Sequence, residues 1–384
     1  MTRRYKLYVL LTIILMIAYI ISDRFNIKNI NISQKTSQNP YSLYLAGSYA
    51  RKTFDFNSAS FYFDELEKID TSEEVVKNVY VLSLVEGDFE KAKQKIPAKD
   101  NTIYFINLSD AVKEKDYKKA KTELAKIESS KEEIIKHLLS AWLYAGENNK
   151  NAAYKELSKI NKEMSGSLSD LHKLYIAIHF NDTKTIDALL QKLEKENLSI
   201  RAVELITYYY CENGKFKEAQ NLVEEKIKDD SMISSLNDFI INYKKPEQKL
   251  FGDIQDGTAE SFMNFSMIIF NPMSWELSLY FDQLSLYMEP NNDFAKILKA
   301  EILEAKNLDK QANEIYNQVS KESFLYASSQ VKLANNYAKD GKLDKSEKLF
   351  KKIIKQYPDY VAAYTYLAEK YISQRDFKNA LETL

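Results

Sequence analysis

Residues 333–384 read LANNYAKDGKLDKSEKLFKKIIKQYPDYVAAYTYLAEKYISQRDFKNALETL, and this stretch decides the fold. Within it and just before it, the small residues Ala312, Ser346 and Ala380 stand 34 positions apart. Each follows a short polar turn and opens an apolar run with helical spacing. The pattern predicts pairs of helices that recur along the chain.

Two consecutive copies of this unit carry similar residue types at matching places. Small residues let the two helices of a pair approach closely, and large residues fill the space against the next pair. Because a single pair cannot bury its apolar face, neighbouring pairs must stack. The first copy has Leu333, Ala334, Tyr337, Gly341, Ser346, Phe350 and Pro358, and the second has Tyr364, Leu367, Ala368, Tyr371, Asp376, Phe377, Ala380 and Leu384. These residues and their period resemble the tetratricopeptide repeat. The resemblance implies an all-α fold, a right-handed solenoid of stacked helical hairpins.

Weaker copies continue toward the N-terminus. They read GKFKEA at 214–219, EKDYKKA at 114–120, EGDFEKA at 86–92 and FDFNSA at 54–59. We therefore expect about ten hairpins after residue 40. The expected units are an N-terminal degenerate array at 41–228, an irregular interruption at 229–275 and a C-terminal array at 276–384. The last repeat is incomplete, which fits either a short final helix or the truncated product of a longer gene.

The interruption combines helix-breaking and aromatic residues. Lys244 and Pro246 end a helix, and FGDIQDG follows at 251–257 as a loop. The aromatic residues of this segment are Phe262, Phe265, Phe270 and Trp275. They line a hinge or specialised pocket, or they belong to a core whose repeats have drifted, and the sequence favours the drifted core.

The N-terminus predicts a membrane anchor. Residues 7–21 read LYVLLTIILMIAYII and follow Arg3, Arg4 and Lys6, in the order typical of a signal anchor. A helix over 5–22 would span roughly 27 Å, close to the thickness of a bilayer core. We therefore expect a transmembrane helix at 1–22 and a polar spacer at 23–40. The basic end favours the cytoplasm, which places the bulk of the chain in the periplasm if the source is bacterial. Secretion after signal cleavage is the alternative.

Charge and composition argue against several classes of function. Lys plus Arg total 54 against 55 for Asp plus Glu, a formal net charge of -1, and no long basic block suggests nucleic-acid binding. The only cysteine, Cys211, permits no disulfide framework or cysteine-rich metal site. It lies in an expected helix beside tyrosines, so we predict a buried, inert thiol.

No motif predicts catalysis, a cofactor or a small-molecule substrate. The three histidines are His137, His172 and His179, and none has the spacing of a metal site. Glycine-rich phosphate loops and nucleophile motifs are missing from the sequence. We therefore predict a protein that is not an enzyme and needs no metal.

The tetratricopeptide resemblance implies a concave groove lined by the first helix of each hairpin, with another protein or peptide as partner. Carried onto this chain, the groove-facing positions are Arg201, Glu204, Tyr208, Asn335, Lys339, Thr365, Glu369 and Ile372. Val331 stands where the family's carboxylate clamp would need a lysine, so an extended or helical peptide is the better expectation.

We expect a membrane-anchored scaffold that assembles a membrane or envelope complex. Two alternatives stay open at this point. One is a periplasmic holdase-type chaperone for secreted chains, and the other is a non-catalytic regulatory subunit of an envelope enzyme.

Overall fold

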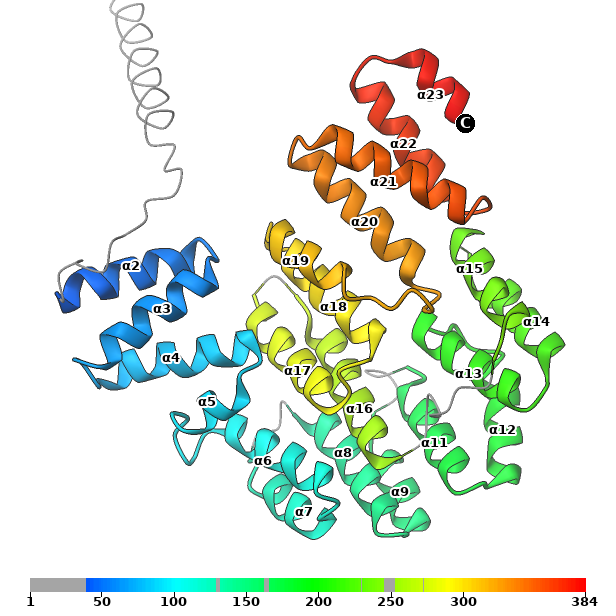
Figure 1. Cartoon of the computed structure of the whole chain (residues 1–384). Helices are drawn as coiled ribbons and strands as arrows, with labels where there is room; N and C mark the ends of the chain where they lie inside the picture. The colour runs from blue at the N-terminus through cyan, green and yellow to red at the C-terminus, as the bar shows by residue number, and fades with distance from the viewer. Residues whose placement is uncertain (1–38, 129–131, 162–165, 229, 245–252, 272) are drawn as a thin grey trace, which may run out of the picture.

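The structure is a computed structural model, and it describes residues 39–128, 132–161, 166–228, 230–244, 253–271 and 273–384. Within these residues all regular secondary structure is helical (Figure 1). The helices are α2 (Pro40–Lys52), α3 (Phe56–Glu67), α4 (Glu73–Glu86), α5 (Phe89–Lys93), α6 (Asn101–Lys113), α7 (Tyr117–Ala125), α8 (Glu133–Gly146), α9 (Lys150–Leu157), α11 (Leu168–His179), α12 (Thr183–Leu193), α13 (Ile200–Glu212), α14 (Phe216–Lys226), α15 (Asp230–Ile241), α16 (Ile254–Ile269), α17 (Trp275–Met288), α18 (Asp293–Glu304), α19 (Asp309–Tyr316), α20 (Tyr326–Lys339), α21 (Leu343–Gln356), α22 (Val361–Ser373) and α23 (Phe377–Thr383). Successive helices pair as antiparallel hairpins, so the all-α, tetratricopeptide-like solenoid predicted above is confirmed.

One kind of turn joins the two helices in nine of the hairpins. A residue with positive φ ends the first helix, and the next residue is the N-cap of the second. The N–H of that N-cap donates to the carbonyl five residues earlier at 2.8 to 3.0 Å, which is the longer bond of a Schellman motif. The residues with positive φ at this position are Phe54, Gly87, Lys115, Asn148, Asn181, Gly214, Asn307, Gly341 and Arg375.

The N-cap side chain often completes the same turn. Asp or Asn at the N-cap accepts a hydrogen bond from a backbone N–H of the new helix, which satisfies one of the unpaired donors at its start. This applies to Asp55, Asp88, Asp116, Asn149, Asp182 and Asp376. The repeat detected in the sequence is therefore a repeat of turn chemistry as well as of apolar spacing.

The hairpin of α16 and α17 lies inside the solenoid instead of extending it. Helix α16 packs against α8 and α6, and α17 packs against α4 and α6 (Figure 1). Gly257 makes the closest approach, because a Cβ added there would lie 2.1 Å from the indole ring of Trp142. The rings of Phe262 and Phe281 lie 6.1 and 5.2 Å from the ring of Phe105. At position 257 only glycine lets the backbone of α16 lie this close to Trp142.

Hydrogen bonds across a long stretch of sequence hold α17 in place. Gln283 Nε2 donates to the backbone carbonyl of Val85 at 2.7 Å, and the Tyr280 hydroxyl donates to the backbone carbonyl of Thr102 at 3.0 Å. Because α4, α6 and α8 are the first helices of their hairpins, α16 and α17 cover the side on which a groove was expected. The chain itself thus occupies the inner face of its N-terminal hairpins.

The segment expected as an interruption, 229–275, contains α15 and α16. Phe262 and Phe265 belong to the buried core, while Phe270 and Trp275 pack against it. One core cluster runs from Ala50 to Leu333, and a second, smaller one runs from Ala327 to Ala380 in the C-terminal array. The Ser231 hydroxyl accepts a 2.9 Å hydrogen bond from the Ala362 N–H, which joins α15 to α22.

The proposed anchor, residues 7–21, lies outside the described residues, as does nearly all of the spacer at 23–40. Among the helices that the structure does describe, none is long and apolar enough to cross a bilayer. Cys211 is buried as predicted, and burial raises the pKa of its thiol to about 11.

Candidate functional site

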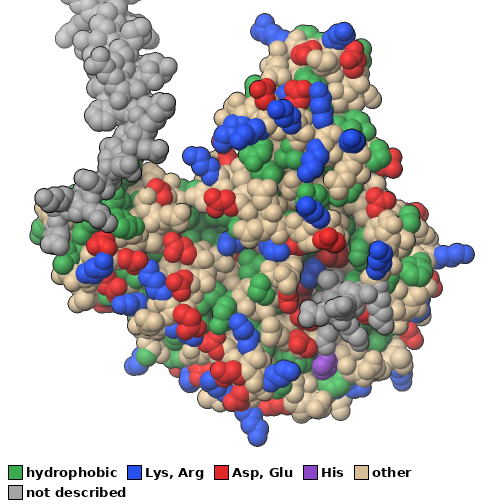
Figure 2. All heavy atoms as spheres, in the orientation of Figure 1, with side chains coloured by type: hydrophobic (Ala, Val, Ile, Leu, Met, Phe, Trp, Pro, Cys, Tyr) green, Lys and Arg blue, Asp and Glu red, His purple; other side chains and the backbone are tan. Residues whose placement is uncertain are grey.

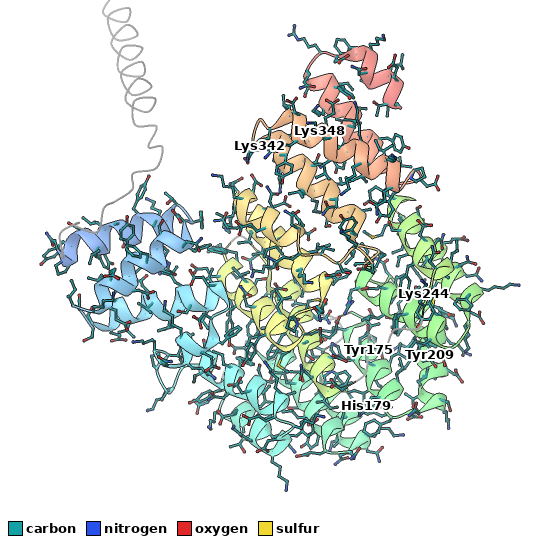
Figure 3. The ribbon with its side chains drawn as sticks, in the orientation of Figure 1. Tyr175, His179, Tyr209, Lys244, Lys342 and Lys348 are labelled. Atoms are coloured by element: carbon teal, nitrogen blue, oxygen red, sulfur yellow. The ribbon has the colours of Figure 1, made fainter. Side chains whose placement is uncertain are left out.

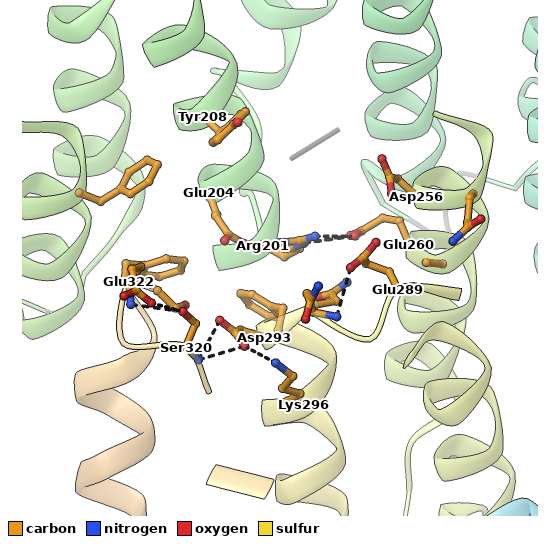
Figure 4. Close-up of a pocket in the computed structure, with 18 of the residues that line it drawn as sticks. Arg201, Glu204, Tyr208, Asp256, Glu260, Glu289, Asp293, Lys296, Ser320 and Glu322 are labelled. Carbon is orange, nitrogen blue, oxygen red and sulfur yellow. Dashed lines mark hydrogen bonds and ion pairs between the residues drawn. The ribbon is translucent and has the colours of Figure 1, made fainter. Parts of the chain in front are cut away.

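A cavity of about 800 Å³ opens where the C-terminal half of the chain faces α13 (Figure 4). Helix α13 forms one wall and the start of α16 another. Helix α18, with the loop before it, forms the third, and the loop between α19 and α20 closes the ring. The cavity exists because α16 folds back inside the solenoid and brings its acidic N-terminus opposite α13.

A buried ion-pair network forms the wall between α13 and α16. Arg201 Nη2 lies 2.9 Å from Glu260 Oε2, and Arg201 Nη1 lies 2.6 Å from Glu204 Oε2. Burial works against the charge of Arg201, but the two carboxylates outweigh it and raise its pKa. Burial also raises the pKa of Glu204, although Arg201 opposes that change. Arg201 thus links α13 to α16. Removing either Arg201 or Glu260 would leave an uncompensated buried charge, which is destabilising.

The start of α18 fixes the opposite wall. Asp293 accepts hydrogen bonds from the Ser320 N–H at 3.2 Å and from Lys296 Nζ at 2.8 Å. The Asn292 side chain caps α18 by accepting from the Ala295 N–H at 3.1 Å. The bonds to Asp293 connect the loop before α20 to the start of α18, so hydrogen bonds hold this wall of the cavity in place.

Helix α16 begins at the cavity with a capping box. The Asp253 side chain accepts from the backbone N–H of Asp256, whose side chain accepts in return from the Asp253 N–H. Two carboxylates therefore stand at the positive end of the helix dipole, where negative charge is stabilised.

The lining carries far more negative than positive charge. Among the described lining residues the cations are Arg201 and Lys296. Its carboxylates are Glu204, Asp253, Asp256, Glu260, Glu289, Asp293 and Glu322. Because the whole chain has a formal net charge of -1, the excess is local to this cavity. Carboxylates gathered in a concave site attract cationic groups and raise their local concentration.

Three of these carboxylates take part in no ion pair among the described residues. Within the described residues, no lysine or arginine lies at ion-pair distance from Asp253, Glu289 or Glu322. Among the described residues, the backbone N–H of Asn291 donates to the Glu289 side chain, at 3.1 Å. The Ser320 hydroxyl donates to Glu322 and lowers the pKa of that carboxyl group. These groups can pair with a cation that comes from outside the chain.

Aromatic rings supply the apolar part of the lining. They are Tyr208, Phe239, Phe294 and Phe324. The guanidinium carbon of Arg201 lies 5.5 Å from the centre of the Phe294 ring, so one cation already uses this surface. Aromatic faces next to carboxylates suit lysine and arginine side chains, whose stems are apolar and whose ends are charged. Among the described residues no group of three or more His, Cys, Asp or Glu side chains is placed to hold a metal ion.

The eight groove positions expected from the sequence fall into two separate groups. Arg201, Glu204 and Tyr208 all line the cavity, yet Arg201 is only 7% and Tyr208 only 6% exposed. Arg201 contacts Glu260 on α16, and Tyr208 packs against Phe239 on α15, so both side chains point toward neighbouring helices and little toward solvent. The other five, on α20 and α22, lie outside the cavity lining; of these Asn335 is half-buried and Lys339, Thr365, Glu369 and Ile372 are exposed.

Most of the lining could not be assigned from the repeat pattern. Asp253 caps α16 and Asp256 and Glu260 lie within it, in the segment expected as an interruption. Asp293 starts α18, and Glu322 precedes α20. The only local signal was the pair of aspartates in FGDIQDG, which suits the first turn of a helix. That signal predicts a helix start and carries no information about what lies opposite.

No protein-family model matches this sequence, and no curated protein matches it. Several solved structures are similar over 90% of this chain. One belongs to the APC/C hetero-tetramer Cut9-Hcn1, at 12% identity, with 78% of that chain covered and a TM-score of 0.31. Another is the P58(IPK) TPR domain, at 15% identity, with 91% covered and a TM-score of 0.24. A third is yeast Tom70, at 11% identity, with 90% covered and a TM-score of 0.27.

Likenesses at these low TM-scores carry over neither an arrangement of helices nor a partner. The tetratricopeptide-like character of this chain rests on its own nine equivalent turns and stacked hairpins.

Proposed function

We propose that this chain is a helical-repeat scaffold, without catalytic activity, that binds a basic segment of another polypeptide in the acidic cavity. The observation that carries the proposal is the local excess of carboxylates, three of which form no ion pair with any described lysine or arginine. The inner face of the N-terminal hairpins is already covered by α16 and α17. The cavity, by contrast, offers both unpaired carboxylates and aromatic walls to a partner.

A polypeptide segment suits the dimensions of the cavity. A volume of about 800 Å³ is large enough for several side chains and too small for a folded domain. One or two lysine or arginine side chains would reach Glu289 and Glu322, with their stems against Phe294 and Phe324. Binding of this kind depends on charge and weakens as salt is added.

The finer parts of the proposal come from the sequence. Residues 7–21 have the composition of a membrane anchor, and the basic residues before them favour a cytoplasmic N-terminus. We infer a bacterial, membrane-anchored protein whose helical body lies in the periplasm and helps to assemble a membrane or envelope complex. The exposed positions Lys339, Thr365, Glu369 and Ile372, with Asn335 beside them, would form a second contact surface.

Equilibrium binding of labelled peptides to the full chain in detergent tests this function. Three peptides of equal length and apolar content, with net charges of about +5, 0 and −5, would be titrated and followed by fluorescence anisotropy. We expect the basic peptide to bind at least about tenfold more tightly than the neutral one, which corresponds to about 1.4 kcal/mol. Its affinity should fall as the ionic strength rises.

Charge-neutral variants locate the binding. Glu289→Gln with Glu322→Gln removes two open carboxylates from the cavity without touching the buried network of Arg201. Glu90→Gln with Glu114→Gln makes the same charge change at exposed side chains of the N-terminal hairpins. The first pair should abolish the preference for the basic peptide, and the second should preserve it. If both pairs of substitutions changed binding equally, the cavity would not be the binding site. If all three peptides bound with similar affinity, a holdase function would be favoured.

A further inference from the structure

The first helix of the array exposes an apolar stripe that nothing in the described part of the chain covers. Tyr41, Leu45 and Tyr49 stand four residues apart on one side of α2, and they are 80%, 68% and 71% exposed. Lys52 continues the same side at the end of the helix and is exposed as well. On the neighbouring α3, Phe61 is 60% exposed. A helix side that meets only water is normally polar.

Helix α21 follows the usual pattern, whereas α23 also exposes apolar side chains, Phe377 at 65% and Leu381 at 78%. The exposed side of α21 carries Lys345, Lys348 and Lys352. Figure 3 shows Lys342 and Lys348 on this part of the surface, and in Figure 2 blue side chains gather over the C-terminal array. The stripe on α2 therefore differs from the lysine-covered side of α21 and has a counterpart on α23.

The position of α2 in the chain points to what covers the stripe. Helix α2 begins at Pro40, and the apolar run of the sequence ends at residue 21. Eighteen residues separate these two points, and a flexible chain of that length would have a root-mean-square reach of roughly 23 Å. If residues 7–21 are inserted in a bilayer, α2 is the part of the array that stays beside its surface.

The residue types fit a lipid surface better than a second copy of the chain. Tyrosine places its ring among apolar groups and its hydroxyl in water, which is why it gathers at membrane interfaces. Lys52 can extend its charged end toward lipid headgroups while its stem stays apolar. A stable protein interface needs about 20 to 30 residues on each side, far more than this stripe provides.

We propose that the outer side of α2, with Tyr41, Leu45 and Tyr49, lies on the bilayer surface as a second membrane contact. The inference rests on the anchor proposed above and goes beyond it. A tether alone leaves the solenoid free to tumble, whereas a second contact fixes which side of the array faces the membrane. The acidic cavity would then be presented to its partner in one orientation.

Site-directed spin labelling of the full chain tests this contact. The protein would be placed in nanodiscs of phosphatidylcholine and phosphatidylglycerol at about three to one, because anionic lipid suits Lys52. Single cysteines would be introduced as Leu45→Cys, Tyr49→Cys, Ile14→Cys and, as an exposed control, Lys348→Cys. The native Cys211 can stay, since it is 2% exposed and its pKa is raised to about 11.

The readout is the collision rate of each label with oxygen, which concentrates in lipid, and with a water-soluble nickel chelate. We expect labels at 14, 45 and 49 to favour oxygen and the label at 348 to favour the chelate. If 14 favours oxygen while 45 and 49 match 348, the anchor stands and the second contact is refuted. If 14 itself matches 348, the anchor fails and the contact fails with it. Labels at 45 and 49 that are shielded from both reagents would also refute the contact, because a protein partner would then cover the stripe.

Discussion

The contact between Gly257 and Trp142 leaves no room for one more carbon atom at position 257. The indole of Trp142 is buried and lies against the backbone of Gly257, where α16 enters the interior. On its other side, the indole N–H donates to His172 Nδ1 at 2.9 Å. His172 is itself buried, and its Nε2 has no partner among the described residues. Three residues from α8, α11 and α16 thus determine how closely the inner hairpin can pack.

Gly257→Ala should destabilise the protein even though alanine is the better helix former. The added methyl group has no room beside Trp142, and such overpacking costs about 1–3 kcal/mol. Chemical denaturation would measure the loss. Gly257→Ala combined with Trp142→Leu should lose less than the sum of the two single variants. Simple additivity would contradict the close contact.

His172 should make the protein less stable in acid. Burial lowers the pKa of its imidazole to about 3, whereas an unfolded histidine titrates near pH 6.5. Between these values the unfolded chain binds a proton that the folded chain does not. The stabilisation from the neutral ring is therefore complete above about pH 6.5 and is lost as the pH falls toward about 3.

The change per pH unit in that window is at most about 1.4 kcal/mol. Urea unfolding at pH 6 and pH 4 would compare the wild type with His172→Gln, whose side-chain amide can still accept from Trp142. The wild type should lose more stability than the variant between these two conditions. Equal losses would show that His172 titrates normally in the folded state.

At the scale of the elements, the hairpin turn is the unit that repeats. It combines a left-handed residue, a Schellman hydrogen bond and, in six of nine cases, an Asp or Asn cap. The left-handed position holds glycine or asparagine in some hairpins and a larger side chain in others. Lys115, with φ of 60°, is one of the larger ones. A residue other than glycine or asparagine is strained there.

Lys115→Gly should therefore raise stability slightly. Relief of the left-handed strain exceeds the entropy that glycine adds to the unfolded chain, with a net gain of roughly 0.5 kcal/mol. Lys348→Gly, at an exposed site inside α21, should instead cost about 1 kcal/mol. Thermal or urea unfolding of both variants measures the difference. A loss of stability for Lys115→Gly would contradict the turn geometry.

The hairpins could be predicted from the sequence because their determinants are local. The turn, the small residue after it and the aromatic residue that follows lie within one repeat, as in 114–120 or 214–219. The burial of Ala120, Ala219 and Ala312 between helices follows directly from that pattern. The path of α16 and α17 could not be predicted this way, because these helices carry no repeat signature.

At the scale of the whole molecule, the solenoid folds around its own hairpin. Gln283 and Val85 stand 198 positions apart in the sequence and share a hydrogen bond. No local pattern encodes such a contact. For the same reason the sequence could place Arg201, Glu204 and Tyr208 on one side of a helix but could not identify Glu260 or Asp293 opposite them. The site is a product of tertiary packing.

This arrangement should divide the molecule into regions of different stability. The first core cluster includes α8, α16 and α17, while the core residues of α21, α22 and α23 belong to the smaller second cluster. We expect amide hydrogens in α21, α22 and α23 to exchange through local opening, at least about tenfold faster than those in α8 and α16. Hydrogen exchange followed by mass spectrometry measures both regions at once. Equal protection would indicate one cooperative unit.

Photo-crosslinking of the full chain in its own membranes tests the central claim most directly. Benzoylphenylalanine would replace Asn291 or Glu322 at the cavity, or Lys348 on α21 as a control. We predict one discrete crosslinked partner from the two cavity positions, lost when excess basic peptide is added and retained with an acidic peptide, and none from position 348. The claim would be contradicted if the cavity positions gave no crosslink. It would equally be contradicted if all three positions gave the same products regardless of the competing peptide.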